Sequence, residues 1–334
     1  MLISVIVLAY NRKEFVQSAL SSVIHQTLGR ECYEIILVSN FSYAEIDEFC
    51  ERNNVRKILL EGSIGEYISK GIEESRGDII TFLEDDDEFT KEKLETLLAL
   101  YNDQEYDLIR NSFVEMDASG KAMKSSVQHK TSFSRPLTFN FVVNKRNISR
   151  STLRFMLARG QDFNLSCMSI SRRLGAKIRE SISRISTCPD GTIFFLALDL
   201  GNVSLFSPVV MSRYRVHDSK SRSFSSFETA MLKLEKDGLD QAESLSKIKD
   251  KITNRNIQSA IDGIIASRKI RAAVLNPLDR RIGLISIPEI LITLSYGSFY
   301  NALWVFLFAL SIFPVFPVRK AIFRYLGNIQ SIIS

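Results

Sequence analysis

Cysteine is scarce in this chain and follows no pattern. Only four of the 334 residues are cysteines, namely Cys32, Cys50, Cys167 and Cys188. None stands in a C-x-x-C pair or at the spacing of zinc ligands, so the sequence indicates neither a disulfide framework nor a zinc knuckle. A reducing, cytosolic location fits this composition best.

The chain also lacks internal repeats and low-complexity tracts. With 45% apolar residues it can bury a full core, which excludes a disordered or fibrous protein. Met1 to Tyr10 is apolar enough to resemble a signal peptide, but it has no basic residue ahead of it and no small-residue cleavage site. We therefore interpret this run as a buried first strand.

Charge is unevenly distributed along the chain. The net charge is +5, yet from Arg268 to Ser334 eight Lys or Arg residues face only two acids. Between Asp117 and Asp162 nine basic residues occur without a single acid. Such a stretch is either a solvated face or a wall that attracts an anionic substrate or lipid.

Long uncharged runs are absent except near the end of the sequence, where no charged residue occurs between Glu289 and Arg319. A bilayer-spanning helix needs about 20 apolar residues, but Pro314 and Pro317 break the second half of this run. Basic groups on both sides favour contact with anionic lipid. We expect a re-entrant or interfacial helical hairpin at the cytosolic membrane face, bent at residues 296–298 or at Pro314. The alternatives are a full span, or an apolar helix packed on the catalytic domain or at a dimer interface.

The first 116 residues alternate short β-rich runs with helical patterns, which predicts β-α-β units and a largely parallel sheet. The expected strands are Ser4–Ala9, Glu34–Val38, Val55–Leu60 and Asp78–Leu83. Helices are expected to follow them, the first capped by Asn11 and the last beginning at Thr90.

The pattern loosens after residue 116. The elements predicted there are a strand-like run at Asn164–Ser171, a helix at Thr192–Leu200 capped by Asp190, a strand at Val209–His217 and helical sequence over Phe227–Val274. The expected organisation has four parts. They are a first half at 1–116, a second half of the same domain at 117–223, a helical linker region at 224–275 and a membrane-associating segment at 276–334.

Four carboxylates directly follow the fourth predicted strand, at Glu84, Asp85, Asp86 and Asp87. In open α/β sheets, ligands gather beyond the carboxyl ends of the strands. A hard divalent cation would relieve the repulsion among these acids, hold a diphosphate and stabilise a departing nucleotide. The alternative is an acidic turn that caps the helix expected at Thr90.

Three segments of the chain match one known arrangement in their order and spacing. They are Ser4 to Arg12 (SVIVLAYNR), Glu34 to Val38 (EIILV) and Gly77 to Asp87 (GDIITFLEDDD), with a weaker continuation at Tyr214 to His217. Together they resemble the family 2 glycosyltransferases of GT-A fold. The resemblance implies an α/β protein with a mostly parallel sheet flanked by helices. It also implies an inverting, hexosyltransferase-like transfer from a nucleotide-sugar donor, with Mn²⁺ or Mg²⁺ on the diphosphate.

The resemblance assigns roles to individual residues. Asp86 is implied as the main metal ligand, with Glu84 in the place of the first Asp of the D-x-D motif. The side chains implied at the donor are Tyr10, Asn11, Arg12, Ser39, Asp85, Arg215 and His217. The family commonly has a base-contacting Asp where this chain has Ser39-Asn40, so the nucleobase stays open.

Inverting transfer requires a general base that deprotonates the acceptor hydroxyl. The family places this base in a Glu-Asp pair at a helix start, and Pro189-Asp190 corresponds to that pair. Asp190 is therefore the candidate base, with plain helix capping as the alternative. Arg215 and His217 lie two apart on a predicted strand and would point to the same face, as expected for groups that meet a diphosphate.

Three competing functions fit the sequence less well. A nucleotidyltransferase would carry a glycine-rich basic loop after its first strand, and residues 12–15 contain no glycine. A phosphatase with an aspartyl nucleophile would carry its acids after the first strand. A non-enzymatic membrane-attached scaffold leaves the four acids without a role. The expected partners are a nucleotide-sugar donor, a lipid-linked or glycan acceptor and a membrane surface, with no nucleic acid.

Overall fold

The computed structural model describes residues 1–123, 137–216, 227–275, 282–296 and 299–312. The chain forms two compact units. The first comprises Met1–Ser125 and Ser134–His217, and the second comprises Ser126–Phe133 and Asp218–Ser334. The β-sheet belongs to the first unit, and the described residues of the second unit form helices.

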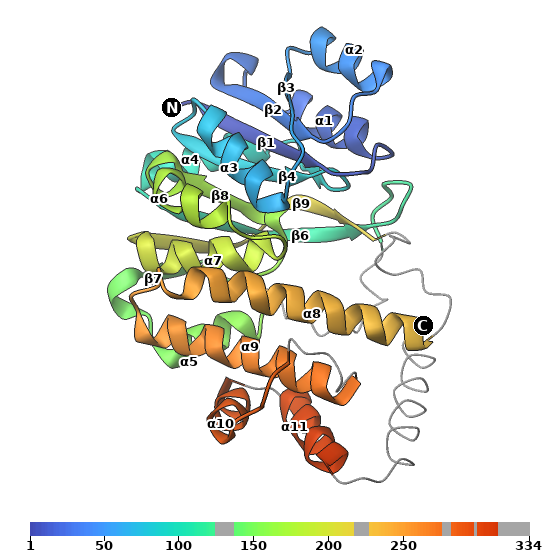
Figure 1. The fold of residues 1–334 in the computed structure, drawn as a ribbon. Helices are drawn as coiled ribbons and strands as arrows, with labels where there is room; N and C mark the ends of the chain where they lie inside the picture. Colours follow the sequence, from blue (N-terminus) through green and yellow to red (C-terminus); the bar gives the residue numbers. More distant parts are fainter. Residues whose placement is uncertain (124–136, 217–226, 276–281, 297–298, 313–334) are drawn as a thin grey trace. The chain divides into compact units, whose positions relative to one another are not determined.

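The first four strands of the first unit form a parallel half-sheet. β1 (Ile3–Ala9) lies between β2 (Tyr33–Ser39) and β4 (Ile79–Glu84), and β3 (Arg56–Leu59) is the outer strand (Figure 1). All pairs among them are parallel. Every residue of β1 is buried, as expected for a parallel strand that is covered on both faces. The residues that follow these strands therefore meet at one edge of the sheet.

Five further strands extend the sheet beyond β4. β8 (Met168–Ser171) pairs antiparallel with both β4 and β6 (Leu108–Met116), and β6 runs parallel to β9 (Val203–Arg215). β5 (Glu88–Phe89) and β7 (Phe141–Asn144) pair antiparallel with β9. Because β6 and β9 run in the direction of β4, their carboxyl ends lie at the same edge as the acids that follow β4.

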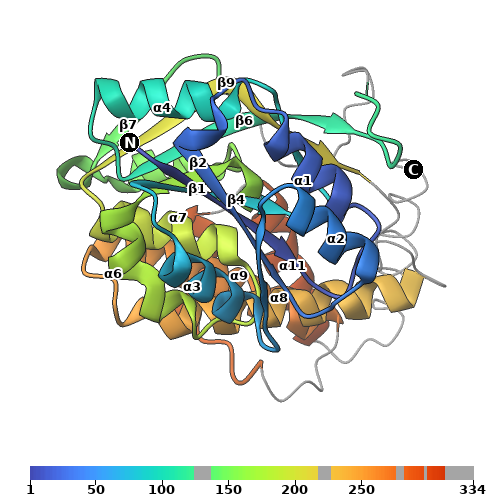
Figure 2. The same cartoon turned by 90° about the horizontal axis from the view of Figure 1, so that it is seen from above.

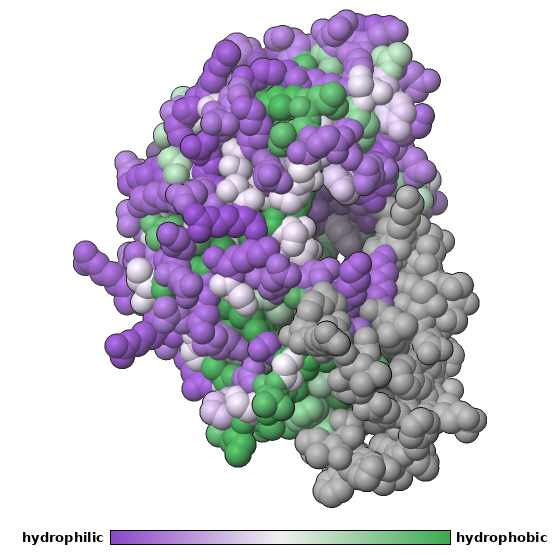
Figure 3. All heavy atoms as spheres, in the orientation of Figure 1, coloured by the Kyte–Doolittle hydropathy of each residue, from purple (hydrophilic) through white to green (hydrophobic). Residues whose placement is uncertain are grey.

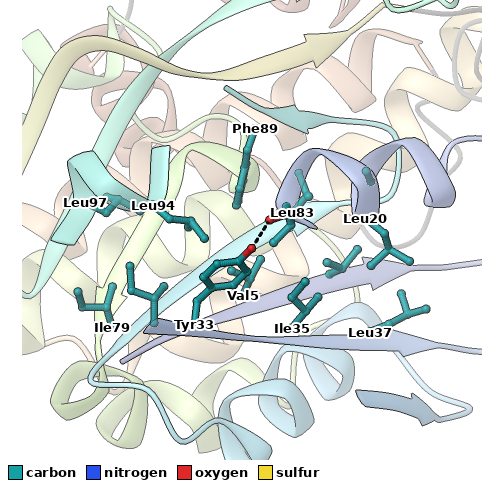
Figure 4. Close-up of a cluster of buried hydrophobic side chains, with 14 of the residues drawn as sticks. Val5, Leu20, Tyr33, Ile35, Leu37, Ile79, Leu83, Phe89, Leu94 and Leu97 are labelled. Carbon is teal, nitrogen blue, oxygen red and sulfur yellow. Dashed lines mark hydrogen bonds between the residues drawn. The ribbon is translucent and has the colours of Figure 1, made fainter. Parts of the chain in front are cut away.

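Helices cover both faces of this sheet (Figure 2). One face carries α1 (Val16–Ile24), α2 (Ala44–Arg52) and α4 (Lys93–Asp103), and their apolar side chains pack on alternate residues of β1 and β2. Figure 4 shows this core, in which the buried Tyr33 hydroxyl donates to the Val23 carbonyl at 3.0 Å. The sequence prediction of a largely parallel sheet flanked by helices is confirmed.

The other face carries α3 (Ile64–Glu74) and α6 (Arg172–Ile182), and α7 (Pro189–Leu200) packs against α6. Two glycines, Gly71 in α3 and Gly175 in α6, allow these helices to approach the sheet closely. A Cβ at Gly71 would lie 2.5 Å from Cγ2 of Ile6, and one at Gly175 would lie 3.1 Å from Cδ1 of Ile80. The short helix α5 (Arg150–Leu157) follows β7.

The second unit is built of four described helices. α8 (Phe227–Lys249) packs beside α9 (Arg255–Leu275), and both α10 (Ile287–Tyr296) and α11 (Phe299–Ile312) pack on α9. α10 ends at Tyr296 and α11 begins at Phe299, which is one of the two places where the sequence predicts a bend. Within the ranges that the structure describes, no helix is long and apolar enough to cross a membrane.

Some predicted boundaries are wrong. Asn11 does not cap α1: it has a positive φ of 55°, and the helix begins at Val16 after Phe15, which makes no capping bond through its side chain. In the run Asn164–Ser171 only β8 is a strand, because a 3-10 turn occupies Leu165–Cys167. α7 begins at Pro189, so Asp190 lies inside its first turn and not at the cap.

Candidate active site

The acidic residues Glu84 to Glu88 form a loop at the carboxyl end of β4. Arg215 binds this loop through its backbone and its side chain. The Arg215 backbone N–H donates to Oδ1 of Asp87 at 3.0 Å, and its Nε donates to the Asp86 carbonyl at 2.7 Å. Its remaining nitrogens bind the Glu88 carboxylate at 2.6 Å and the carbonyls of Asp117 and Ala118 at 3.3 and 3.0 Å. Only 2% of this side chain is exposed. Arg215 is therefore engaged in shaping the loop.

Arg12 reaches the same loop from the end of β1. Its guanidinium is paired with Asp85 and lies 2.7 Å from Oδ2 of Asp86. The Arg12 side chain is 30% exposed, whereas that of Asp85 is 6% exposed. The structure thus brings together two of the predicted donor-binding residues and one of the predicted metal ligands.

Burial raises the pKa values of several acids in this loop. It raises the pKa of Asp85 to about 6, against the opposing effect of Arg12. It raises the pKa of Asp87 to about 7, and the neighbouring Asp86 charge adds to the shift. The pKa of Glu84 lies well above its ordinary value because of burial first, and then because of the charges of Asp87, Asp86, Asp190 and Asp85. Burial, together with repulsion among neighbouring carboxylates, therefore favours the protonated forms of these acids.

Asp190 belongs to the same constellation although it lies about a hundred residues away in sequence. Its charge is close enough to raise the pKa of Glu84. Its Oδ2 accepts the backbone N–H of Asn164 at 3.0 Å, and its Oδ1 accepts that of Gly191 at 2.9 Å. Asn164 has a positive φ of 70°, which is uncommon for a residue other than glycine. Burial raises the pKa of Asp190 in spite of these two bonds.

A buried lysine lies beneath the loop, and the sequence analysis missed it. Lys93 is fully buried, and its Nζ donates to the Ser166 carbonyl at 2.7 Å and to Oγ of Ser212 at 3.1 Å. Burial lowers its pKa to about 7, while the nearby charge of Asp87 acts in the opposite direction. Oγ of Ser166 in turn accepts the backbone N–H of Glu84 at 3.0 Å. Lys93 therefore supports the strand end that carries the acids.

The loops after β1 and β2 are joined by two asparagines. The Asn11 backbone N–H donates to Oδ1 of Asn40 at 2.9 Å, and Nδ2 of Asn40 donates to Oδ1 of Asn11 at 2.6 Å. Ser39 is fully buried and donates to the Phe41 carbonyl at 3.0 Å. Asn40 is therefore the residue of the Ser39-Asn40 pair that presents its side chain at the sheet edge.

Tyr10 stands at the same edge. It is 53% exposed, and its ring lies edge-on to that of the buried Tyr67, with 5.8 Å between the ring centroids. An exposed aromatic ring with a fixed neighbour can receive a flat ligand group. His217, the remaining residue predicted at the donor, lies outside the described residues.

Glu84, the last residue of β4, and Asp86, two residues further on, are the predicted metal ligands. Among the residues that the structure describes, no three or more His, Cys, Asp or Glu side chains form a group that could hold a metal ion. Mg²⁺ usually takes one or two carboxylates and completes its shell with water and substrate phosphates. The neighbouring carboxylates of Asp87, Asp86, Asp190 and Asp85 act on Glu84, and a bound cation would relieve this repulsion.

Residues 4–173 match the sequence profile of glycosyl transferase family 2. The chain belongs to this family. The match covers β1, β4 and the acidic loop, and it ends just inside α6. The predicted resemblance to the family 2 glycosyltransferases is thereby confirmed.

Curated glycosyltransferases are similar to this chain over part of their length. An uncharacterized glycosyltransferase of Rickettsia bellii is 27% identical over 209 residues, which cover 58% of this chain and 30% of the relative. The putative glycosyltransferase EpsH of Bacillus subtilis is 28% identical over 131 residues, which cover 37% of this chain and 38% of the relative. The matched part thus spans less than half of either relative.

Solved structures share the fold of this family 2 chain. TarS of S. aureus, residues 1–349 in complex with UDP-GlcNAc, superimposes with a TM-score of 0.55 at 16% identity, over 89% of this chain and 80% of the TarS chain. The same TarS fragment with UDP gives a TM-score of 0.51 at 14% identity, over 92% of this chain and 89% of the TarS chain. At this identity the likeness shows a common fold of GT-A type.

Proposed function

We propose that this chain is an inverting glycosyltransferase that moves a sugar from a nucleotide-diphosphate sugar to a hydroxyl acceptor. The observation that carries the proposal is the closeness of Asp190 to the acidic strand end. Two hydrogen bonds fix the Asp190 carboxylate, and its charge acts on Glu84. A base for the acceptor and ligands for the donor's metal are both needed for this reaction, and they would then share one edge of the sheet.

Asp190 is proposed as the general base. A carboxylate whose pKa is raised by burial is a stronger proton acceptor than one in water. The N–H groups of Gly191 and Asn164 each bind one of its oxygens, so the carboxylate has a defined orientation toward the acceptor hydroxyl. It would take the hydroxyl proton as the acceptor oxygen bonds to the anomeric carbon and the bond to the diphosphate breaks.

Glu84 and Asp86 are proposed to hold Mn²⁺ or Mg²⁺. When bound, such an ion supplies Lewis-acid stabilisation of the charge that develops on the leaving diphosphate. Arg12 lies beside Asp86 and is proposed to add positive charge at the donor. Arg215 is proposed to act on the donor indirectly, through the loop that its side chain holds.

The donor's nucleoside is proposed to lie between Tyr10 and the Asn11–Asn40 pair. The complex of TarS with UDP-GlcNAc supports a nucleotide-sugar donor for a chain of the same fold. Where the family commonly has an Asp that contacts the nucleobase, this chain presents the neutral amide of Asn40. An amide can both donate and accept hydrogen bonds, so it suits uracil, guanine or another base. Lipid-linked or surface glycans at the cytosolic membrane face are proposed as acceptors, because nine basic residues between Asp117 and Asp162 would favour an anionic surface.

A donor panel tests this function. Purified protein would be titrated with UDP-, GDP- and dTDP-sugars, with Mn²⁺ or with EDTA, and membrane extract would then be added as the acceptor. We expect tight binding of one nucleotide class only with the ion, followed by transfer with inversion at the anomeric carbon, measured by NMR of the product. Retention of the anomeric configuration, or equal binding in EDTA, would contradict the proposal.

A further inference from the structure

One face of α10 exposes large apolar side chains to solvent. Leu284, just before the helix, is 97% exposed, and Ile287, Leu291 and Leu294 are 73%, 60% and 42% exposed. The three helical positions are four and three residues apart, which places them on one side of the helix. Figure 3 shows apolar residues gathered around α10. Single exposed apolar residues are common on soluble proteins, but a continuous stripe of them marks an interaction surface.

α11, which contacts α10, also exposes apolar side chains. Phe306 is 59% exposed, and Ala302 and Ala309 are exposed on the same side of the helix. The other sides of both helices are buried. Thr293 of α10 is 1% exposed and Trp304 of α11 is 4% exposed, and Ile290 packs with Trp304 against α9. Each helix therefore uses one side for packing within the unit and leaves an apolar side outward.

Charge around this surface favours an anionic partner. Between residues 282 and 312 the only charged residue is Glu289, and it pairs with Lys269 at 3.2 Å. In the sequence, Arg280 and Arg281 directly precede this region, and Arg319, Lys320 and Arg324 follow it. In the sequence, an apolar segment flanked by cations suits the acyl and headgroup layers of an anionic membrane. A second copy of the chain would carry the same basic flanks.

We propose that the apolar surface formed by Leu284, Ile287, Leu291, Leu294 and Phe306 docks in the plane of an anionic lipid bilayer. The 10 residues of α10 and the 14 of α11 extend about 15 and 21 Å, less than the hydrocarbon thickness of about 30 Å. The two helices therefore lie along the interface, with the apolar stripes among the acyl chains. This proposal rests on the membrane-facing acceptor of the proposed function.

Vesicle flotation of the full chain tests the proposal. The vesicles would be phosphatidylcholine alone, or an equal mixture with phosphatidylglycerol. We expect binding to the mixed vesicles, weakened by added salt because the cations act through screened charge. Leu291→Glu and Phe306→Glu should each lower the vesicle affinity by about tenfold or more, the effect of withdrawing one large apolar side chain from the bilayer.

The control is Val209→Glu, since Val209 is 47% exposed on β9 of the first unit. It should bind vesicles like the wild type. Leu291→Ala is a milder variant that should give a smaller loss in the same direction. Unchanged vesicle binding in Leu291→Glu would overturn the proposal. It would equally be overturned if the wild type bound no vesicles and Leu291→Glu converted a dimer to a monomer in analytical ultracentrifugation, because the face would then join two copies.

Nucleotide-sugar binding measured on the same variants separates this proposal from the function on which it rests. Leu291→Glu should keep the donor affinity of the wild type while its affinity for vesicles falls. A different result would separate the two proposals. If Leu291→Glu lost vesicle binding and the wild type bound no donor, the enzymatic function would be contradicted and the docking surface would still be supported.

Discussion

Buried acids lie at both ends of the strands in the sheet, and their surroundings differ. Asp107 lies at the amino end of β6, and Glu84, Asp85 and Asp87 lie at the carboxyl end of β4. Asp107, before β6, accepts from Arg173 at 3.0 Å, from Oγ of Ser171 at 2.7 Å and from the Asn202 backbone at 2.6 Å. These bonds, with the Arg173 charge, lower its pKa in spite of burial. At the other end the pKa values of Glu84, Asp85 and Asp87 are raised. The fold pairs Asp107 with three donors, whereas burial and mutual repulsion disfavour the charged forms of the acids at the end of β4.

The largest expected effect is that of Asp86→Ala. We expect loss of transfer and of ion-dependent donor binding, because the variant lacks the main proposed metal ligand. The fold should stay intact, since removing an acid from a crowded group also relieves repulsion. Turnover assays with Mn²⁺ and Mg²⁺, beside circular dichroism, measure both. Full turnover in this variant would show that the metal is held elsewhere.

Asp190→Asn should keep nucleotide-sugar affinity and lower turnover at least ~100-fold, the lower end of what a positioned base contributes. The amide keeps the shape of the carboxylate but takes up no proton. Steady-state kinetics and donor titration would be compared with Asp103→Asn, an exposed acid at the end of α4. A loss that follows unfolding of the variant, or no loss, would move the base to another residue.

Asp107→Ala should act on stability instead of chemistry. It leaves the part-buried Asn202 backbone N–H and the Ser171 hydroxyl without their acceptor, and we expect the free energy of unfolding to fall by about 2 kcal/mol. Residual turnover per folded molecule should equal that of the wild type. Urea unfolding with Asp103→Ala as the control measures this. A turnover loss without destabilisation would remove the distinction between the two groups of acids.

The last expected effect is a pH dependence of stability. Asp85 and Asp87 have folded-state pKa values of about 6 and about 7, above their unfolded values of about 4. The folded state therefore binds protons more tightly, so this contribution to stability is complete below pH about 4 and is lost as the pH rises to about 7. Asp87→Asn should flatten that decline in thermal unfolding scans. Mn²⁺ should restore stability at pH 7 in the wild type and fail to do so in Asp86→Ala.

Strands β1, β2 and β4 could be predicted from sequence because they are nearly continuous buried apolar runs, and the acids could be placed because they stand at the end of β4 and directly after it. Lys93 could not be found this way. A lysine at the start of an amphipathic helix is usually solvated, and only the contacts with Ser166 and Ser212, more than seventy residues away, bury it. Asn11 was expected at a helix cap, but its side chain pairs with Asn40 across two loops.

The hydrogen bond between Asp190 and the Asn164 backbone also could not be predicted from the sequence. Asn164 makes this bond from a backbone conformation with positive φ. A single asparagine in a sequence does not predict that conformation. The strands β6 and β7 and helices α5 and α6 were also missing from the prediction. They lie in a part of the chain where basic and polar residues interrupt the apolar period, so that tertiary packing decides their structure.

The way Arg215 is bound has a kinetic consequence for any ion that enters the loop. Its nitrogens already tie Asp86, Glu88 and Ala118 together, so the loop needs little rearrangement when a ligand arrives. The slow event would then be the release of water from the ion itself. Because Mg²⁺ gives up its water reluctantly, Mn²⁺ should load faster than Mg²⁺ even where the two ions support the same final turnover.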